Sequence, residues 1–523
     1  MKLQRLYIDK YRVLKDLNIK FSSSAEHPIA LARRPDYALD FLVGINGSGK
    51  STVLQLLCDL MQRLERIAQA PIPYLFILEY DLNEGNQRRR IKVSNIPDEE
   101  DEEIEYTAPV KVSENGQPVS ISNFLFPKQV VAYTTGGEED WKNLGRENSE
   151  STVGLEAFQS LSHSERALEL AIRELPGKPL SSSLYETSQE INKQNEEQIF
   201  LLIQSHQLDK VILCGLLADL AEPENRRLLK VLDAVKITDD GFVGFSLKFR
   251  KTHQPAYVGD WDDVEKLAEI ATRRLRLGSD YLLIFDLKSS NNSIPQQIIE
   301  QFFTCLNLFK KLARLANINT DGQSVLRDVN IFIERPSATK HPEIEVDISP
   351  LHLLKWFSDG ERTFLGRMCL MRLISATESL ILLDEPEVHF NDLWKRQIVQ
   401  FLDETLQGCH SHVLITTHSS ITLTDVPSED IIVLDRNGSY TDTAINPAIR
   451  TLAADPSDIM VHVFGAPHPA GESSVERIKH ELDTLSNRQP EEKQQALEGL
   501  LSVVAQGYWS YRIRRELSAI EKE

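Results

Sequence analysis

The N-terminal part of the chain has the pattern of short strands with a helix among them. Apolar side chains recur at every second or third position between residues 3 and 21, which predicts two half-buried strands around a turn. The apolar run 38–43 predicts a buried strand, and the amphipathic segment 52–68 predicts a helix after it. Further strands are expected at 73–80, 88–93 and 128–133. Alternating strand and helix signals of this kind indicate an α/β fold.

Between about residue 150 and residue 340 the pattern changes to longer amphipathic segments. Helices are expected near 155–174, 186–221, 260–277 and 294–317, and strands at 242–249, 281–287 and 329–334. No apolar repeat of seven residues continues through several heptads in these segments. We therefore expect a compact, mainly helical insertion with a few strands, and no coiled-coil arm. Residues 350–440 then return to short strands and helices, and the tail from about 445 to 523 is expected to be helical.

The composition is that of an ordinary globular chain. Of the 523 residues, 41% are hydrophobic and 26% are charged, and no segment approaches the roughly 18 uninterrupted apolar residues of a membrane helix. The N-terminus has charges every few residues and lacks the apolar region of a signal peptide. Five dispersed cysteines without a CxxC pair favour reduced thiols. We therefore expect a cytoplasmic protein without a membrane partner.

The formal net charge of −20 bears on nucleic-acid binding. Such a surface repels nucleic acid on average, so contact with DNA or RNA requires a local basic patch or a partner. A solvated face or salt bridges would explain each basic cluster of the chain equally well. These clusters are Arg88-Arg89-Arg90, Arg273-Arg274-Arg276 and Arg512-Arg514-Arg515.

The segment after the strand 38–43 carries the strongest chemical signal. It fits the pattern GxxxxGK[ST], with an apolar strand before it and a helix after it. Glycines let backbone N–H groups approach phosphate oxygens, and the helix N-terminus adds partial positive charge. Lys50 is placed to reach the β- and γ-phosphates of a nucleotide, and the Ser51 hydroxyl to bind Mg²⁺. The candidate phosphate-binding residues are Gly44, Asn46, Gly47, Ser48, Gly49, Lys50, Ser51 and Thr52.

Two later strands end in polar residues. The apolar strand 379–384 ends in Asp384, a candidate Mg²⁺ ligand, and Glu385 follows it, placed to orient or deprotonate an attacking water. The strand 414–417 delivers His418, which could contact a γ-phosphate. Buried strands often end in an acid, and a lone histidine at a strand end is usually unremarkable. The spacing of these residues after a phosphate loop favours the catalytic interpretation.

A helix is expected to begin near Ser358. The Ser358 hydroxyl and the N–H of Gly360 would form an anion site at the helix N-terminus. A capping box between Ser358 and Glu361 explains the same residues equally well on local grounds. The order of the motifs favours the anion site: phosphate loop, S-x-G-E, a strand ending in DE, then TTH.

This order resembles the ATP-binding-cassette (ABC) ATPases, with Ser358 to Glu361 matching their signature motif. Within that class, LYIDKYRVLKDLNIKF, DEPEVHFND and THSS are similar to the branch that contains the RecF, SMC and OLD proteins. The insertion and the tail, FGAPHPAGESSVERI followed by GYWSYRIRREL, most resemble the PtuA ATPases of Septu anti-phage systems, including retron-associated ones. The class resemblance covers roughly residues 1–140 and 345–440.

The resemblance implies an α/β ATPase head of the ABC type with a mixed sheet, a compact α+β insertion and a helical tail. The N-terminal half of the head would be residues 1–145, the insertion 146–345, the C-terminal half 346–440, and a partner-docking tail 441–523.

The resemblance also implies ATP and Mg²⁺ as ligands. The loop from Gly44 to Thr52 would be the Walker A loop, Asp384 the Walker B carboxylate, Glu385 the catalytic base and His418 the switch histidine. Ser358, Gly360 and Glu361 would serve the ATP held by a second protomer. Asp359 departs from the commoner Gly or Ser and places a negative charge near a triphosphate. Gln129 is a weak candidate for the Q-loop.

Both half-sites lie in one chain, so the resemblance implies a head-to-tail ATP-sandwich dimer or a higher oligomer. It further implies an HNH-type nuclease partner (PtuB-like) and, in a retron-linked version, a reverse transcriptase with its DNA–RNA product. The chain itself shows no nuclease motif, so nucleic acid would be reached through the complex. The alternative is a stand-alone RecF-like repair ATPase that binds DNA directly. Tyr508, Trp509 and Tyr511 are candidate docking residues, unless they pack the tail onto the insertion.

Overall fold

The computed structural model of the chain forms two compact units, residues 1–453 and 454–523. The four-part division expected from the sequence stays a prediction within these two units. The expected helix 155–174 and the first part of the expected helix 186–221 lie outside the described residues. These are 1–22, 37–65, 72–84, 87–96, 109–120, 125–136, 140–141, 144, 199–251, 260–288, 293–317, 323–335, 351–375, 378–468, 470–485 and 489–520.

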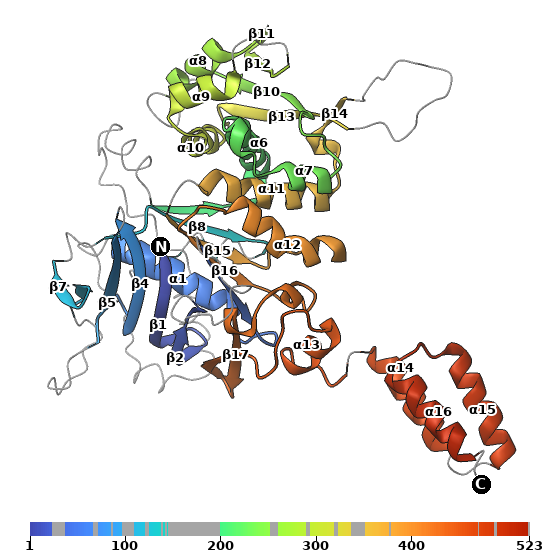
Figure 1. Cartoon of the computed structure of the whole chain (residues 1–523). Helices are drawn as coiled ribbons and strands as arrows, with labels where there is room; N and C mark the ends of the chain where they lie inside the picture. The colour runs from blue at the N-terminus through green and yellow to red at the C-terminus, as the bar shows by residue number, and fades with distance from the viewer. Residues whose placement is uncertain are drawn as a thin grey trace, which may run out of the picture. The chain divides into compact units, whose positions relative to one another are not determined.

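The larger unit is built on a 13-stranded mixed sheet in the order β7-β6-β5-β4-β1-β2-β18-β17-β3-β16-β15-β8-β9 (Figure 1). Its strands from β17 to β9 pair in parallel. Every residue of the four strands β3, β8, β15 and β16 is buried, which explains their continuous apolar sequences. The parallel strands are β3 (Ala38–Val43), β8 (Gln129–Thr134), β9 (Phe200–Ile203), β15 (Ser379–Asp384), β16 (His412–Thr416) and β17 (Ile431–Asn437).

The other part of this sheet is mostly antiparallel and includes the N-terminus. Its strands are β1 (Lys2–Tyr11), β2 (Leu14–Lys20), β4 (Phe76–Glu84), β5 (Gln87–Ser94), β6 (Lys111–Glu114), β7 (Gln117–Val119) and β18 (Tyr440–Ile445). Helix α1 (Lys50–Glu65) lies against β8, β9, β15 and β16. Its buried residues join those of β1, β2 and β4 in one apolar core. The α/β fold expected from the sequence is therefore present.

The insertion contains a second, antiparallel sheet. It has five strands in the order β11 (Arg273–Leu277), β12 (Asp280–Asp286), β10 (Phe242–Arg250), β13 (Leu326–Glu334) and β14 (Leu351–Leu353). Its helices are α6 (Leu208–Leu220), α7 (Leu229–Ala234), α8 (Asp260–Ile270), α9 (Ile294–Phe302) and α10 (Cys305–Leu315). The strands expected at 242–249, 281–287 and 329–334 are confirmed.

Three of the helices expected in the insertion are wrong in extent. The described part of the helix expected over 186–221 begins only at Leu208, because residues 200–203 pair with β8 as strand β9. The helix expected over 260–277 ends at Ile270, because residues 273–277 pair with β12 as the edge strand β11. The helix expected over 294–317 is two helices, because the backbone turns at Phe303, whose φ is 66°.

Helix α11 (Asp359–Ile374) joins the insertion to the head by packing against α6, as Figure 1 shows. A Cβ on Gly215 of α6 would lie 2.5 Å from Cys369, and a Cβ on Gly366 of α11 would lie 2.2 Å from Leu208. A glycine on each helix therefore permits this close crossing. Helix α12 (Asp392–Thr405) packs on the other part of α11.

The smaller unit is helical, as expected. It contains α13 (Pro456–His462), α14 (Glu472–Leu485), α15 (Pro490–Val503) and α16 (Tyr508–Ile520), with Leu485, Leu497 and Ile513 at its centre. The helical tail begins later than residue 441, because residues 440–445 pair with β17 and β2 as strand β18. Among the described helices of both units, none has the length and apolar character needed to cross a bilayer.

Candidate active site

The loop between β3 and α1 folds as a cradle of backbone. Gly44, Gly47 and Gly49 have φ values of 148°, 81° and 81°, which residues with a side chain rarely adopt. A Cβ on Gly44 would lie 2.5 Å from the carbonyl oxygen of Leu434, so the loop has no room for a side chain there. Thr441 Oγ1 donates to the Ser48 carbonyl at 3.0 Å and ties the loop to β18. Asn46 at the tip is exposed, whereas Ser51 and Thr52 in the first turn of α1 are half-buried.

The Lys50 side chain folds over this loop. Its Nζ donates to the carbonyl oxygens of Gly44 and Ile45 at 3.1 and 3.2 Å. Burial lowers the pKa of Lys50, and the nearby carboxylates of Glu385 and Asp384 act in the opposite direction. A phosphate group in the loop would stabilise the charged ammonium further.

Asp384 lies at the centre of three hydroxyl groups. Ser51 Oγ donates to its Oδ1 at 2.8 Å, Thr416 Oγ1 donates to Oδ1 at 2.7 Å, and Thr134 Oγ1 donates to Oδ2 at 3.2 Å. The two threonines are the partners of Asp384 in the strand register, one on each side. Neither threonine is among the site residues expected from the sequence. The available signal was their position at the carboxyl ends of apolar strands, where parallel strands bring their last residues together.

Glu385 and His418 face each other at the edge of the sheet. His418 Nε2 lies 3.3 Å from Glu385 Oε1, and the two side chains are 36% and 37% exposed. Glu385 has a φ of 49°, and its N–H donates to Thr416 Oγ1 at 3.0 Å. A left-handed residue that is not glycine costs on the order of 1–3 kcal/mol and is typical of functional sites. Burial and then the charge of Lys50 lower the pKa of His418, so its imidazole is neutral at pH 7.

A buried polar group behind these residues was not anticipated from the sequence. Thr417 Oγ1 donates to Glu387 Oε1, and burial raises the pKa of Glu387. Arg367 of α11 is also buried, 5.2 Å from the ring of Tyr133 and 4.9 Å from the ring of Phe390. Strands β8 and β16 and helix α11 therefore meet in one packed polar cluster directly behind Glu385 and His418.

The residues present fit a nucleotide with Mg²⁺. The Ser51 hydroxyl and the Asp384 carboxylate are the hard oxygen ligands that Mg²⁺ prefers, usually beside water and phosphate oxygens. The buried Ser48 Oγ has no hydrogen-bond partner among the described residues, so it is available to a ligand in the cradle. Within those same ranges no three His, Cys, Asp or Glu side chains cluster to hold a metal ion.

The signature residues Ser358, Gly360 and Glu361 lie at the N-terminus of α11. The capping box forms: Ser358 N–H donates to Glu361 Oε2 at 2.9 Å, and Glu361 N–H donates to Ser358 Oγ at 3.3 Å. Glu361 also pairs with Arg335 at 2.5 Å, and a Cβ on Gly360 would lie 2.9 Å from the His389 carbonyl. Ser358 and Asp359 are exposed. The local interpretation of the motif is therefore correct, and its role toward a second protomer's ATP stays a prediction.

Gln129 is not placed to act as a Q-loop, so that candidate is wrong. It is paired with Ser379, whereas Asp384 is paired with Thr134, so Gln129 lies at the opposite end of β8 from the site. Its amide instead donates to the Ile199 carbonyl, which fastens β8 to the segment before β9.

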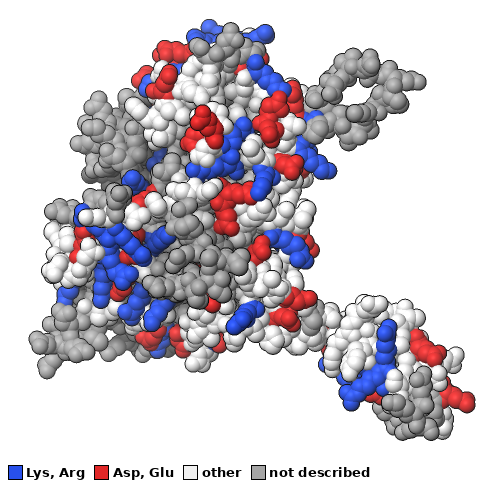
Figure 2. Space-filling model, in the orientation of Figure 1, with Lys and Arg blue, Asp and Glu red and all other residues white. Residues whose placement is uncertain are grey.

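The first basic cluster is largely neutralised. Figure 2 shows Lys and Arg side chains gathered over the antiparallel strands. Arg88 and Arg90 both pair with Asp81, and Arg89 pairs with Glu114. The second cluster is exposed on β11, and in the third Arg512 lies 5.7 Å from the ring of Trp509.

The chain matches known proteins in part of its length. Residues 252–425 match the family described as "AAA domain, putative AbiEii toxin, Type IV TA system". Protein ea59 of Escherichia phage lambda is 23% identical over 171 residues, which are 29% of this chain and 33% of that protein. The chain thus spans about a third of the length of this relative.

Solved structures of SMC heads are distantly similar. The SMC head domain from Thermotoga maritima has a TM-score of 0.34 and 11% identity over 86% of this chain and 100% of that chain. An Smc head from Pyrococcus furiosus, bound to the C-terminal domain of ScpA, has a TM-score of 0.32 and 12% identity over 85% of this chain and 96% of that chain.

The segment that matches the family contains the signature helix, Asp384, Glu385 and His418. The phosphate loop lies before this segment in the sequence, and the fold brings Asp384, Glu385 and His418 to it. About a third of the chain, residues 252–425, is therefore similar to this family of AAA domains.

Proposed function

We propose that this protein binds ATP with Mg²⁺ in the loop Gly44–Thr52 and hydrolyses it through Glu385. The observation that carries the proposal is the meeting of Ser51 with Asp384 at 2.8 Å, beside Lys50, Glu385 and His418. These residues come from opposite halves of the chain and converge at the carboxyl ends of neighbouring strands. A structural role alone would not require a glycine cradle, a buried lysine and a strained acid at one place.

Each side chain has a distinct part in the proposed reaction. Lys50 and the backbone of the cradle hold the phosphates, and Ser51 and Asp384 hold the metal, which when bound neutralises phosphate charge. Glu385 accepts the proton of the attacking water. The neutral imidazole of His418, 3.3 Å from Glu385, fixes the carboxylate and contacts the γ-phosphate. The threonines beside Asp384 hold that carboxylate in its orientation through their hydrogen bonds.

We further propose that two copies close on ATP head to tail. The exposed N-terminus of α11, with Ser358 at its tip, would approach the phosphates bound by the other copy. A helix N-terminus with free backbone N–H groups favours such an anion. Asp359 beside it would weaken this contact until the charge of the triphosphate is balanced by Mg²⁺ and Lys50.

The biological setting we propose is anti-phage defence. The description of the matched family names a toxin of a type IV toxin–antitoxin system. The relative Protein ea59 comes from a phage. Together with the PtuA-like tail, this supports an ATPase subunit that controls an HNH-type, PtuB-like nuclease. A reverse transcriptase with its DNA–RNA product would join the complex in a retron-linked version.

The hydrolysis proposal is tested with Glu385→Gln. Removing a general base lowers kcat by about 10²- to 10⁴-fold, whereas ATP affinity should stay within a few-fold because the phosphate loop is untouched. Light scattering should show stronger ATP-dependent self-association of the variant. Glu429→Gln, which changes an exposed acid of the same unit, is the matched control. Wild-type hydrolysis by Glu385→Gln would refute the assignment.

The partner proposal is tested on the smaller unit. Tyr508 and Tyr511 are 67% and 65% exposed, so replacing both with Ala removes docking area without touching the core at Ile513. A co-expressed PtuB-like nuclease should then be lost on purification while ATP binding persists. Retention of the nuclease at the wild-type ratio would contradict docking through these aromatics.

A further inference from the structure

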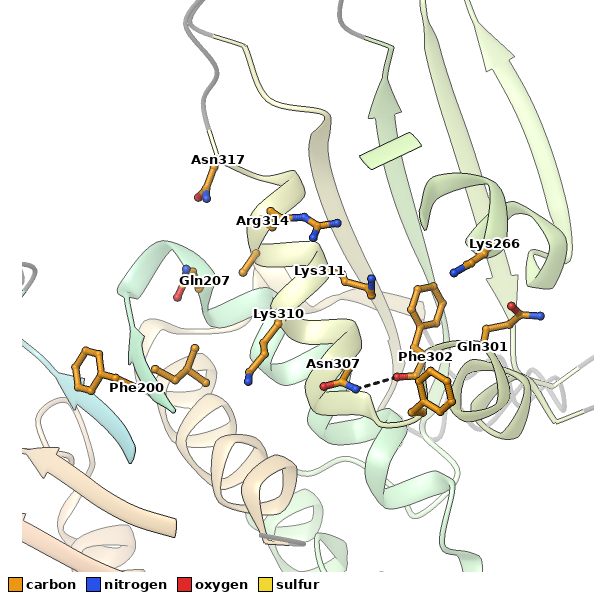
Figure 3. Close-up of a pocket in the computed structure, with 13 residues that line it drawn as sticks. Phe200, Gln207, Lys266, Gln301, Phe302, Asn307, Lys310, Lys311, Arg314 and Asn317 are labelled. Carbon is orange, nitrogen blue, oxygen red and sulfur yellow. Dashed lines mark hydrogen bonds between the residues drawn. The ribbon is translucent and has the colours of Figure 1, made fainter. Parts of the chain in front are cut away.

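A second cavity, away from the nucleotide site, lies beside α10. It has a volume of about 520 Å³ and is lined by residues of β9, the start of α6, and α8, α9 and α10 (Figure 3). On the head side it begins at Phe200, which is paired with Val130 near the start of β8. Asp384 is level with the other end of β8. Nucleotide bound at the phosphate loop therefore leaves this cavity open to a separate ligand.

The wall that α10 contributes is a cationic stripe. Asn307, Lys310, Lys311 and Arg314 recur at helical spacing on one face of α10, while the opposite face is buried and apolar. Lys266 of α8 adds a fourth cation. Among the described residues that line the cavity, these four are cationic and none is acidic. In a chain of net charge −20, this is a local reversal of sign.

One carboxylate outside the lining holds two of these cations in place. Asp263 accepts from Lys311 at 3.1 Å and from Arg314 at 2.7 Å. Asp263 lies outside the lining, so both ion pairs fix the two side chains from behind the described wall of the cavity. The side chains are therefore fixed in advance for an anion, which reduces the entropy lost on binding.

An aromatic ring stands at the end of the same cavity. Phe303, between α9 and α10, is 79% exposed and has a φ of 66°. Glycine would adopt this backbone conformation with less strain, and the exposed ring gains little from packing. Phe303 lines the cavity together with Gln301 and Asn307. Neither stability nor the turn itself explains a phenylalanine at this position.

We infer that this cavity binds a nucleotide unit, with its phosphate on the α10 stripe and its base against Phe303. Cations beside an exposed aromatic ring are the combination that binds nucleotides without reading sequence. The volume is within the range of small-ligand sites and suits one such unit. The unit is either a free mononucleotide or one residue of a single strand, because both present the same phosphate and base.

The probe is a fluorescein-labelled oligothymidylate, followed by anisotropy with the full chain at low salt. The chain carries Lys50→Ala and no other nucleotide is added, so the phosphate loop is weakened and nothing competes for the cavity. Phe303→Gly removes the ring and relieves the backbone strain, so the melting temperature should stay near that of the chain that keeps Phe303 while affinity falls at least about tenfold. Lys266→Ala with Lys310→Ala should weaken binding and flatten its salt dependence. Arg273→Ala with Arg274→Ala, the same loss of charge on exposed β11, is the matched control.

Competition by dTMP separates the two sources of the ligand. Displacement of the oligonucleotide by dTMP assigns the cavity to a single nucleotide, and displacement only by unlabelled oligonucleotide assigns it to a strand. Either result supports the inference if the cavity variants weaken binding and the β11 control does not. Failure of the chain with Lys50→Ala alone to bind either probe, or equal binding after Phe303→Gly is added, overturns it. Because Lys50→Ala removes the ammonium of the phosphate loop, this outcome is independent of the hydrolysis proposal.

Discussion

Gly44→Ala tests whether the cradle is closed to a side chain. At this position two costs add. The φ of 148° is strained for alanine, at about 1–3 kcal/mol. The new Cβ would also lie 2.5 Å from the Leu434 carbonyl and 2.6 Å from Ser48 Oγ, which adds an overpacking cost of about 1–3 kcal/mol. Because the carbonyl belongs to the backbone of β17, it has little freedom to move aside.

Gly47→Ala provides the matched comparison. Its φ of 81° carries a similar strain, but the nearest atom to a Cβ is Nη1 of Arg436 at 3.4 Å, the end of a flexible side chain. Only the cost of about 1–3 kcal/mol from the backbone therefore applies. The difference between the two variants isolates the clash with Leu434.

The assay is thermal unfolding without nucleotide at one fixed scan rate. At about 2.1 cal/mol/K per residue, the unit of 453 residues has an unfolding entropy near 1 kcal/mol/K, so each kcal/mol lowers the melting temperature by about 1 °C. We expect a decrease of about 2–6 °C for Gly44→Ala and about 1–3 °C for Gly47→Ala. An equal or larger decrease for Gly47→Ala would refute the reasoning.

Two further predictions concern buried groups of the larger unit. His412 is fully buried, accepts the N–H of Leu3 on Nδ1 at 2.8 Å, and places Nε2 2.9 Å from Asp40 Oδ2. His412→Leu removes the acceptor of the Leu3 N–H and the ring nitrogen beside Asp40 Oδ2, while Ser22 N–H still donates to Oδ1 at 3.0 Å. Leaving a buried polar group unpaired should lower the free energy of unfolding by about 1–3 kcal/mol. At about 1 °C per kcal/mol, an unchanged melting temperature would contradict this. All five cysteines are buried and free, and burial raises the pKa of Cys305 to about 12 and that of Cys58 well above its ordinary value. A thiol reagent at pH 8 should therefore react only after denaturant is added, and rapid reaction of the native chain would show that these side chains open to solvent.

The phosphate loop could be predicted from sequence because all its requirements are local. A buried strand, glycines at fixed offsets and a following helix are contained in residues 38–65. The capping box at Ser358 was also visible, because its residues are three positions apart. Local patterns did not show whether Ser358 and Glu361 also bind a ligand.

The residues missed were those that only strand register or packing brings to the site. Thr134 is an unremarkable strand end until β8 pairs with β15 and places it opposite Asp384. Arg367 lies in an amphipathic helix whose sequence does not reveal the rings of Tyr133 and Phe390 around it.

The error over residues 260–277 has a similar cause. Arginine and leucine favour helices, so RRLRL was assigned to one. Pairing with β12 along the whole segment outweighs that preference. The same limit affected Gln129, because the end of the strand at which it lies follows from the register alone.

The central place of β3 in the sheet has a consequence for biosynthesis. Its two neighbours, β16 and β17, are made much later, because 369 positions separate Val43 from His412. At about 5–20 residues per second, a ribosome needs about 20–70 s to supply the first of them. During that interval β3, whose six residues are all buried in the folded protein, has unpaired backbone N–H and C=O groups along both of its edges. A nascent chain stalled before residue 437 should thus be a substrate for holding chaperones, and a fragment ending there should aggregate.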